Sequence, residues 1–182
     1  NYDKIVGIFS RQSGKSTCIA IYALWHSLMH EYTKCLIISP TQEQSDLMFR
    51  KIKAFLNDNP ELTKLIKRET ATELEFLNNS MIKSLPVGNE GKTIRGHTAD
   101  LIILEESAFI KDVIVNQVIM PMAAAQQNPK IIQISTPFSK NHFYQATNSD
   151  KYKVHLYGWE HAVRNGIMNQ EYILEQQEQN LP

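Results

Sequence analysis

Short apolar runs alternate with longer segments of helical periodicity along the first part of the chain. Residues 4–9 and residues 35–39 are apolar runs of strand length, and residues 15–30 repeat apolar side chains at helical spacing. Thr41, followed by acidic and amide side chains, is typical of the cap of a helix that runs to about residue 56. The chain therefore opens with two successive strand and helix units.

The pattern changes to shorter pieces in the middle of the chain. Residues 73–77 and 81–85 have strand character, and Asn78-Asn79-Ser80 between them is typical of a hairpin turn. Residues 87–99 are rich in glycine and polar side chains, which predicts a loop. We therefore expect a small antiparallel β insertion followed by a long connection.

A strand at residues 100–104, apolar from Leu101 to Leu104, follows and ends on Glu105 and Glu106. Further expected elements are a helix at 113–125 interrupted near Pro121, a strand at 130–135, a helix at 141–147, a strand at 152–157 and an amphipathic tail at 169–179. Strands that alternate with helices predict an α/β fold with a mostly parallel sheet and helices on both faces. Sites in such folds lie at the carboxyl ends of the strands.

Composition limits the size and partners of this fold. The chain has 182 residues, 42% of them hydrophobic, which predicts one domain with a sizeable core. Lysine plus arginine and aspartate plus glutamate both number 19, so contacts with nucleic acid must be local. No apolar run is long enough to span a bilayer, and no membrane partner is expected. The chain begins on Asn1 rather than methionine, which suggests a fragment of a longer polypeptide.

Gly14-Lys15-Ser16, between a predicted strand and a predicted helix, has the features of a phosphate-binding loop. Helix N-terminal amides bind phosphate oxygens, a lysine reaches the β and γ phosphates, and a serine hydroxyl ligates Mg²⁺. Phe9 stands where the full motif has its first glycine, and the alternative is an ordinary turn before a helix. The predicted ATP-binding segment is Arg11-Gln12-Ser13-Gly14-Lys15-Ser16-Thr17.

The acidic pair supplies the second half of a nucleotide-hydrolysing site. Glu105 is placed to reach Mg²⁺ together with Ser16, and Glu106 is placed to polarise the attacking water. For an isolated junction of this kind, the alternative is two glutamates that begin a solvated helix. Because the acidic pair follows a phosphate-binding loop in the same chain, the catalytic interpretation is favoured.

Two further positions are compatible with a role in catalysis or with a plain structural role. Arg11, three residues before Gly14, is close enough to offset the charge on a γ-phosphate, or it is a surface arginine. Ser135 and Thr136 end the strand after the acidic strand, where they could sense hydrolysis or simply terminate the strand. Spacing alone leaves both alternatives open.

Four segments together resemble the large terminase subunit of tailed viruses. In that family, the phosphate-binding loop carries Ser-Arg-Gln in the region of the usual first glycine, as residues 10–12 do here. The other highly specific feature is the Arg-Gly loop ahead of the acidic strand. The segments are Ser10-Arg11-Gln12-Ser13-Gly14-Lys15-Ser16, Thr93-Ile94-Arg95-Gly96, residues 100–110 and Ile134-Ser135-Thr136-Pro137. The resemblance implies a P-loop NTPase domain of the RecA/ASCE type.

The resemblance also implies an activity, partners and a place of action. Large terminases hydrolyse ATP with Mg²⁺ to drive double-stranded DNA into a preformed capsid, as a ring of subunits that works with a portal protein and a small terminase subunit. The implied location is the host cytoplasm, transiently docked on the procapsid, and an isolated domain could be monomeric. The implied residues are Lys15 and Ser16 on phosphate and Mg²⁺, Arg11 as a cis arginine, Glu105 on the metal, Glu106 as the catalytic carboxylate, and Ser135 with Thr136 as the coupling motif.

Some features depart from the family or allow other functions. The family usually has aspartate at the position of Glu105, and its C-terminal nuclease domain is expected to be absent from this chain. A helicase-like nucleic-acid translocase and a non-enzymatic nucleotide-binding module are the alternatives. Arg95 is the candidate for a contact with a neighbouring subunit or DNA, ahead of a second basic cluster at Lys64, Lys67 and Arg68. The histidines have no metal-ligand spacing.

Overall fold

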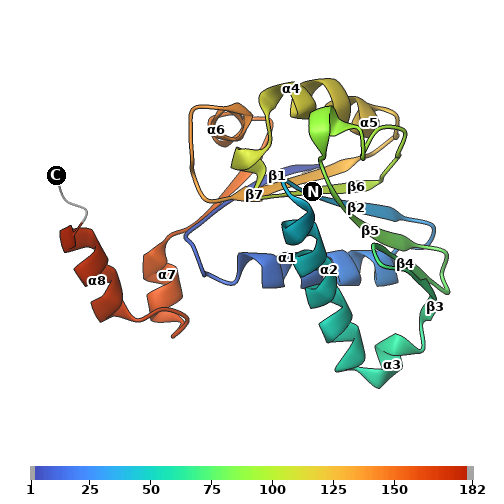
Figure 1. Ribbon diagram of the computed structural model, residues 1–182, viewed down its shortest axis with the longest axis horizontal. Helices are drawn as coiled ribbons and strands as arrows, with labels where there is room; N and C mark the ends of the chain where they lie inside the picture. Colours follow the sequence, from blue (N-terminus) through green and yellow to red (C-terminus); the bar gives the residue numbers. More distant parts are fainter. Residues whose placement is uncertain (1–2, 180–182) are drawn as a thin grey trace.

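The computed structural model describes residues 3–179, and a single eight-stranded sheet forms its centre (Figure 1). The strand order is β3-β4-β5-β2-β6-β7-β1-β8, and only the pairs β3/β4 and β4/β5 are antiparallel. The predicted mostly parallel α/β fold is therefore confirmed. The strands are β1 (Lys4–Phe9), β2 (Lys34–Ser39), β3 (Ile66–Glu69), β4 (Glu73–Phe76), β5 (Met81–Pro86), β6 (Leu101–Glu105), β7 (Lys130–Ser135) and β8 (Lys153–Tyr157).

Helices cover both faces of this sheet. In Figure 1, α1 and α2 lie below the sheet, and α4, α5 and α6 lie above it. The α-helices are α1 (Lys15–Met29), α2 (Gln42–Asn57), α3 (Pro60–Thr63), α4 (Asp112–Ile114), α5 (Met120–Ala124), α6 (His142–Thr147), α7 (Trp159–Arg164) and α8 (Gln170–Gln179). Two 3₁₀ turns, η1 (Asn89–Gly91) and η2 (Ser107–Phe109), and a π-helical segment, η3 (Val115–Ile119), complete the elements.

β6 shows how the two layers of the core form. All five of its residues are buried. Leu101 and Ile103 pack in the cluster on the side of α1 and α2, whereas Ile102 and Leu104 pack in the cluster on the side of α4 and α5. A strand covered on both faces needs a continuous apolar run, because its successive side chains point to opposite faces. This central position carries Glu105 and Glu106 to the carboxyl edge of the sheet.

The predicted antiparallel insertion extends the main sheet. β4 and β5 form the expected hairpin, and β5 also pairs in parallel with β2. The sequence patterns named two strands here, and the structure adds β3 beside β4. Three of the four residues of β3 are exposed, so this edge strand has no apolar alternation to reveal it.

The predicted interruption near Pro121 is confirmed and has a local cause. The helical segment from α4 to α5 contains a π-helical stretch that ends at Ile119, and Pro121 is the second residue of α5. Proline has no N–H to donate, and it is tolerated at the beginning of a helix. The wider π turn lets the chain pass the proline without ending the helical path.

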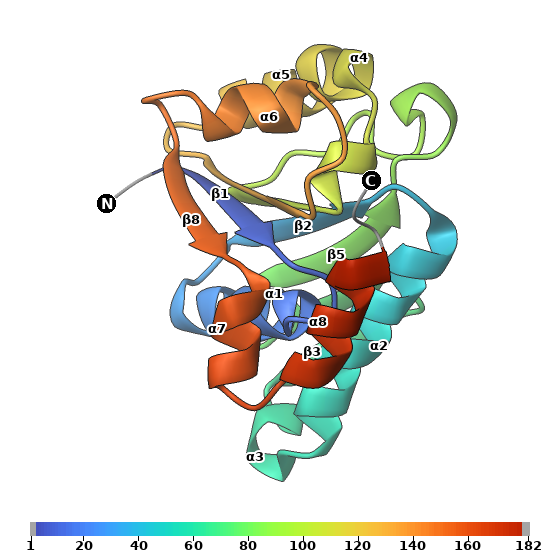
Figure 2. The same ribbon diagram turned by 90° about the vertical axis from the view of Figure 1, so that its left-hand side faces the viewer.

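The last described elements lie apart from this core. β8 is an edge strand whose five residues are all exposed, and α7 and α8 extend away from the sheet in Figure 1. Figure 2, turned by 90°, shows the same two helices on the side of β8. Within the part of the chain that the structure describes, no helix is long and apolar enough to cross a bilayer.

Candidate functional site

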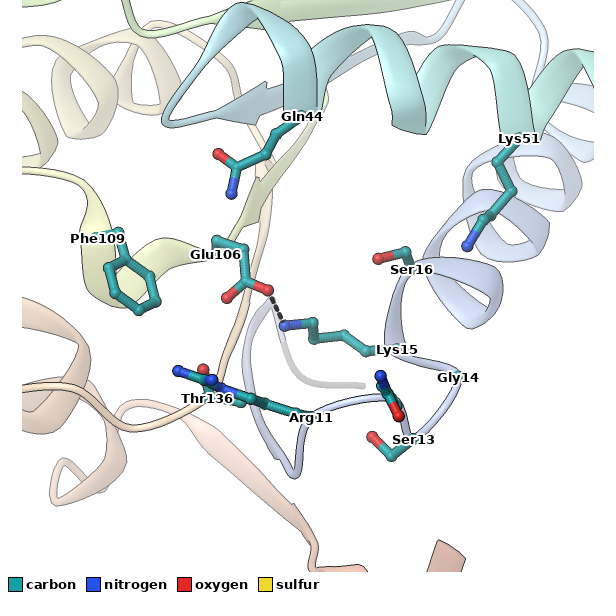
Figure 3. Close-up of a pocket in the computed structure, with 11 residues that line it drawn as sticks. Arg11, Ser13, Gly14, Lys15, Ser16, Gln44, Lys51, Glu106, Phe109 and Thr136 are labelled. Atoms are coloured by element: carbon teal, nitrogen blue, oxygen red, sulfur yellow. Dashed lines mark hydrogen bonds and ion pairs between the residues drawn. The ribbon is translucent and has the colours of Figure 1, made fainter. Parts of the chain in front are cut away.

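A pocket of about 580 Å³ opens where β1, β6 and β7 end (Figure 3). Parallel strands bring their carboxyl ends to one edge of a sheet, so three separated segments of sequence meet there. The pocket is lined by Arg11, Gln12, Ser13, Gly14, Lys15, Ser16, Gln44, Lys51, Glu106, Phe109 and Thr136. The predicted phosphate-binding loop and the second acid therefore lie in one cavity.

The loop between β1 and α1 has the backbone shape that anion binding requires. Ser13 Oγ donates a hydrogen bond to the carbonyl of Ser10 at 2.7 Å, which closes the turn. Gln12 and Gly14 have left-handed backbone angles, with φ of 58° and 82°, and glycine is the residue that adopts this region most readily. Gly14 is the N-cap of α1, so the first amides of the helix, which lack intrahelical acceptors, are available to a phosphate.

The position of Phe9 explains why this loop forms without the usual first glycine. It is the last residue of β1, and its ring stacks on Tyr157 of β8 with centroids 4.9 Å apart. The left-handed positions of the loop begin later, at Gln12. A strand residue has an extended backbone that any side chain tolerates, so glycine is not needed at position 9.

Lys15 and Glu106 face each other across the pocket. Lys15 Nζ forms an ion pair with Glu106 Oε1 (Figure 3). Ser135 Oγ, at the end of β7, donates a hydrogen bond to Glu106 Oε2 at 3.2 Å. One lysine, one carboxylate and one hydroxyl from three different segments therefore converge on one point.

The backbone at Glu106 is unusual. Its angles, φ 48° and ψ 43°, lie in the left-handed region, which costs a non-glycine residue about 1–3 kcal/mol. This conformation turns the chain sharply at the end of β6 and directs the Glu106 side chain toward Lys15. Strained positions of this kind persist only where the surrounding contacts fix them.

Glu105 occupies a different environment from its neighbour. It is only 6% exposed, and its oxygens accept hydrogen bonds from Ser16 Oγ at 2.6 Å and from Ser39 Oγ at 3.3 Å. Burial raises the pKa of the Glu105 carboxyl above its ordinary value, and the hydrogen bonds from the two hydroxyl groups offset only part of this rise. A carboxylate and hydroxyl oxygens are the hard donors that Mg²⁺ prefers, so Ser16 and Glu105 fit the predicted metal site. The longer glutamate side chain still reaches Ser16.

Other predicted residues divide between the pocket and its surroundings. Arg11 and Thr136 line the pocket. Thr17 is not one of its lining residues, and its hydroxyl accepts a hydrogen bond from Lys51 at 3.4 Å. Arg95 lies in an exposed turn outside the lining, and its Nη2 is 3.5 Å from the carbonyl of Glu90. The structure therefore brings together the loop, the two acids and the Ser135-Thr136 pair, but not Arg95.

Comparison with protein families places this site in a known context. Residues 6–172 match the family described as "Terminase large subunit, T4likevirus-type, N-terminal". The chain belongs to this terminase family. The resemblance carried by the loop and the acidic strand is thus confirmed over most of the chain.

Individual terminases show the same relationship. The large terminase subunit of Thermus virus P23-45 is 26% identical over 187 residues, which cover 90% of this chain and 35% of the relative. The large terminase ATPase domain of Thermus phage P74-26 has the same fold, with a TM-score of 0.82 and 18% identity over 100% of this chain and 84% of that one. A large terminase from a thermophilic bacteriophage, solved in complex with ADP, has a TM-score of 0.75 and 13% identity over 100% of this chain and 46% of that one. The chain thus spans about a third of its curated relative.

The terminase pocket includes side chains that the sequence patterns did not indicate as site residues. Gln44 and Lys51 line it from α2, Phe109 lines it from η2, and Ser39 bonds Glu105 from the end of β2. Gln44 and Lys51 are seven residues apart and so share one helix face, which was the available signal. For Ser39, the signal was its position at the carboxyl end of a strand.

The predicted basic cluster of this terminase domain is neutralised by neighbouring acids. Lys64 pairs with Glu61 at 2.7 Å and Lys67 pairs with Glu75 at 2.7 Å. Arg68 pairs with both Glu73 and Glu75. These contacts leave the cluster a poor candidate for binding DNA phosphates.

Proposed function

We propose that this domain binds ATP in the pocket and hydrolyses it with Mg²⁺. The observation that carries the proposal is the convergence of Lys15, Glu106 and Ser135 beside the phosphate-binding loop. A terminase of the same fold has been solved with ADP, which supports a nucleotide in a pocket of this kind. The family assignment favours a packaging ATPase over a helicase-like translocase.

In this proposal, Lys15 binds the nucleotide phosphates. Its ammonium group pairs with Glu106, and phosphate oxygens compete with that carboxylate for the same three donors. The amides at the start of α1 add donors that are already oriented. Phosphate binding thus draws Lys15 away from Glu106 and frees a carboxylate oxygen.

Glu106 then acts on the attacking water. A free Oε1 accepts a hydrogen bond from water and orients it toward the γ-phosphate, which is the role of a catalytic base or water-positioning residue. Ser135 holds Oε2, so loss of the γ-phosphate changes the contacts of a carboxylate that is already linked to β7. In this proposal, Ser135 and the adjacent Thr136, which lines the pocket, pass the change to the next loop.

Ser16 and Glu105 would hold the Mg²⁺ of the nucleotide. When bound, Mg²⁺ neutralises phosphate charge and supports departure of the leaving group. Arg11 lines the same pocket from the turn before Gly14, and its guanidinium offsets charge that develops during transfer. In this proposal, each of these side chains has a separate task within the site.

Two variants test the proposal in the purified protein. Lys15→Ala removes the ammonium group that binds phosphate, and Glu106→Gln keeps the side-chain size but removes the negative charge. We expect each to lower kcat/KM for ATP by about 100-fold or more. Lys64→Ala, which removes an exposed lysine paired with Glu61, is the matched control and should retain the native rate. Native turnover by both site variants would overturn the assignment.

The biological role proposed for this activity is packaging of double-stranded viral DNA. The protein would act as a homo-oligomeric ring with a portal protein and a small terminase subunit, in the host cytoplasm and transiently docked on a procapsid. Support comes from the terminase family match. The hydrolysis variants also test this role, because in a DNA packaging assay Glu106→Gln protein should fill no capsids. Packaging at the native rate by that variant would separate the domain from the motor.

A further inference from the structure

The chain that follows β6 and the chain from the end of β7 onward are held together by several contacts. The first contains Glu106 and the second contains Ser135, the two residues that meet in the pocket. Their other contacts are Ser107 Oγ with His142 Nε2 at 3.1 Å, the Asn141 side-chain amide donating to the Ala108 carbonyl at 2.6 Å, the rings of Phe109 and Phe138 at 4.6 Å, and His142 Nδ1 with Asp112 Oδ1 at 2.8 Å.

Ser107, His142 and Asp112 within this contact form a serine, histidine and aspartate set. The same side-chain types make nucleophilic triads, in which the serine hydroxyl must be accessible to a substrate. Ser107 is 0% exposed and His142 is 6% exposed. A substrate cannot reach this serine, so the set acts through what it holds in place.

The hydrogen bonds orient the imidazole of His142. The Asp112 carboxylate accepts bonds from the His142 backbone N–H at 3.1 Å and from Nδ1, and these two bonds lower the pKa of the Asp112 carboxyl. Since an ionised carboxylate only accepts, Nδ1 carries a proton, and Nε2 on the other side of the ring lies within hydrogen-bond distance of Ser107 Oγ. The Ser107 hydroxyl donates a hydrogen bond to Gln133 Oε1 of β7 at 3.0 Å.

Ser107 directly follows the strained residue of the pocket. Glu106 is left-handed, and the turn after it is closed by the amides of Phe109 and Ile110, which donate to the carbonyls of Glu106 at 2.9 Å and Ser107 at 3.0 Å. The buried Ser107 side chain is bound to β7 and to α6 at once. These bonds fix the residue from which the Glu106 carboxylate projects.

We propose that His142 and Ser107 are positioning residues for Glu106, holding its left-handed turn so that its carboxylate points to Lys15. Asp112 orients His142, and α6 thereby becomes part of the support for the catalytic carboxylate. The effect on turnover rests on the proposed ATPase function. The effect on the stability of the turn is independent of that function.

Two substitutions of His142 separate its two contacts. The side-chain nitrogen of asparagine lies near the place of Nδ1, and that of glutamine lies near the place of Nε2. We expect His142→Asn, which keeps Asp112 and loses Ser107, to lower kcat about tenfold with KM for ATP within about twofold of native. His142→Gln, which keeps Ser107, should restore kcat to within about threefold of native.

Hydrogen exchange measures the turn without any turnover. Ser107→Ala should speed exchange of the Phe109 and Ile110 amides by about tenfold, because the turn opens more often once its anchor is removed. Ser84→Ala is the matched control: Ser84 is also 0% exposed and donates to the Ser45 carbonyl at 3.0 Å, on β5 away from the pocket. It should leave both amides unchanged.

The outcomes distinguish this inference from the proposed function. Native exchange at Phe109 and Ile110 in Ser107→Ala protein would overturn the inference, as would equal kcat values for the asparagine and glutamine variants of an active enzyme. If the native protein does not hydrolyse ATP, the proposed function fails and the exchange measurement alone decides the inference. Faster exchange in Ser107→Ala protein, together with a lower kcat for His142→Asn than for His142→Gln, supports both the inference and the proposed function.

Discussion

Two regions of this domain contain similar ion pairs in different surroundings. In the pocket, Lys15 pairs with Glu106, with side chains that are 9% and 23% exposed. On the β3 and β4 edge, Arg68 pairs with Glu73, and the arginine side chain is 58% exposed. Exposed pairs contribute about 0.2–1 kcal/mol each, because water screens them and the side chains lose freedom. The pairing of charges therefore does not by itself mark a site.

The location of each pair explains the difference. Lys15 and Glu106 follow the ends of parallel strands, where helices cover both faces and a cavity opens. Arg68 lies on the edge strand β3, where three of the four residues are exposed, and it reaches over to Glu73 on the neighbouring antiparallel strand β4. In the covered region, each charge has few alternatives to its partner or a ligand, and this makes the pocket pair sensitive to substitution.

The largest expected effect concerns Glu105, the buried acid beside the pocket pair. Glu105→Gln removes the charge that Ser16 and Ser39 face, and we expect it to lower Mg²⁺-dependent ATP turnover about 100-fold. Glu105→Asp keeps the charge and should lose less than about tenfold. Glu75→Gln, on the exposed edge, should keep the native rate, and steady-state kinetics across Mg²⁺ concentrations measures all three.

That result would fail in two ways. A Glu105→Gln enzyme with native turnover and native Mg²⁺ dependence would remove Glu105 from the metal site. A Glu75→Gln enzyme with a similar loss would show that the edge region matters to catalysis, and the contrast between the regions would then be wrong.

The order of motifs in the sequence predicted the pocket, but not its complete lining. Lys15, Ser16, Glu105 and Glu106 could be predicted because parallel strands bring their carboxyl ends together whatever the loops between them do. Spacing puts Lys51 on the same face of α2 as Gln44, but it does not say that this face turns toward the pocket, because the rotation of α2 against the sheet follows from packing.

Backbone conformation was a second limit on prediction from sequence. A left-handed glutamate is uncommon, so two glutamates after a strand indicate their chemistry but not their directions. In the structure, Glu105 points to Ser16 and Glu106 points to Lys15, because the chain turns sharply between them. The sequence showed only that the histidines lack metal-ligand spacing, and it gave no sign that His142 bonds both Ser107 and Asp112.

A smaller effect is expected from the contrast between Arg68 and Arg95. Arg68 is neutralised by two glutamates, whereas Arg95 is exposed with a backbone carbonyl 3.5 Å away. If Arg95 contacts DNA or a neighbouring subunit, Arg95→Ala should lower DNA-stimulated ATP turnover roughly tenfold. Arg68→Ala should change it less than about twofold.

Measurements with and without DNA decide the matter for Arg95. The Arg95→Ala protein should keep the native turnover rate without DNA, because Arg95 lies outside the pocket lining. Equal DNA stimulation of the native, Arg95→Ala and Arg68→Ala proteins would exclude both arginines as contacts.

The smallest expected effect concerns His26, at the opposite end of α1 from Lys15. His26 is buried, its Nδ1 has no hydrogen-bond partner within the described residues, and burial, with the nearby His30 and Lys130, lowers its pKa from 6.5 to about 4. The unfolded chain therefore binds a proton from about pH 6.5 downward, while the folded protein resists it until about pH 4. Stability should fall as pH falls through this window.

Thermal unfolding between pH 7 and pH 4 tests this sign. The native Tm should decrease by a few degrees over the window, and His26→Phe, which cannot take up the proton, should show a shallower decrease. His155→Phe, on the exposed strand β8, is the control and should follow the native curve. Parallel curves for all three proteins would show that His26 titrates normally and that, away from the pocket, burial alone does not make a charge costly in this fold.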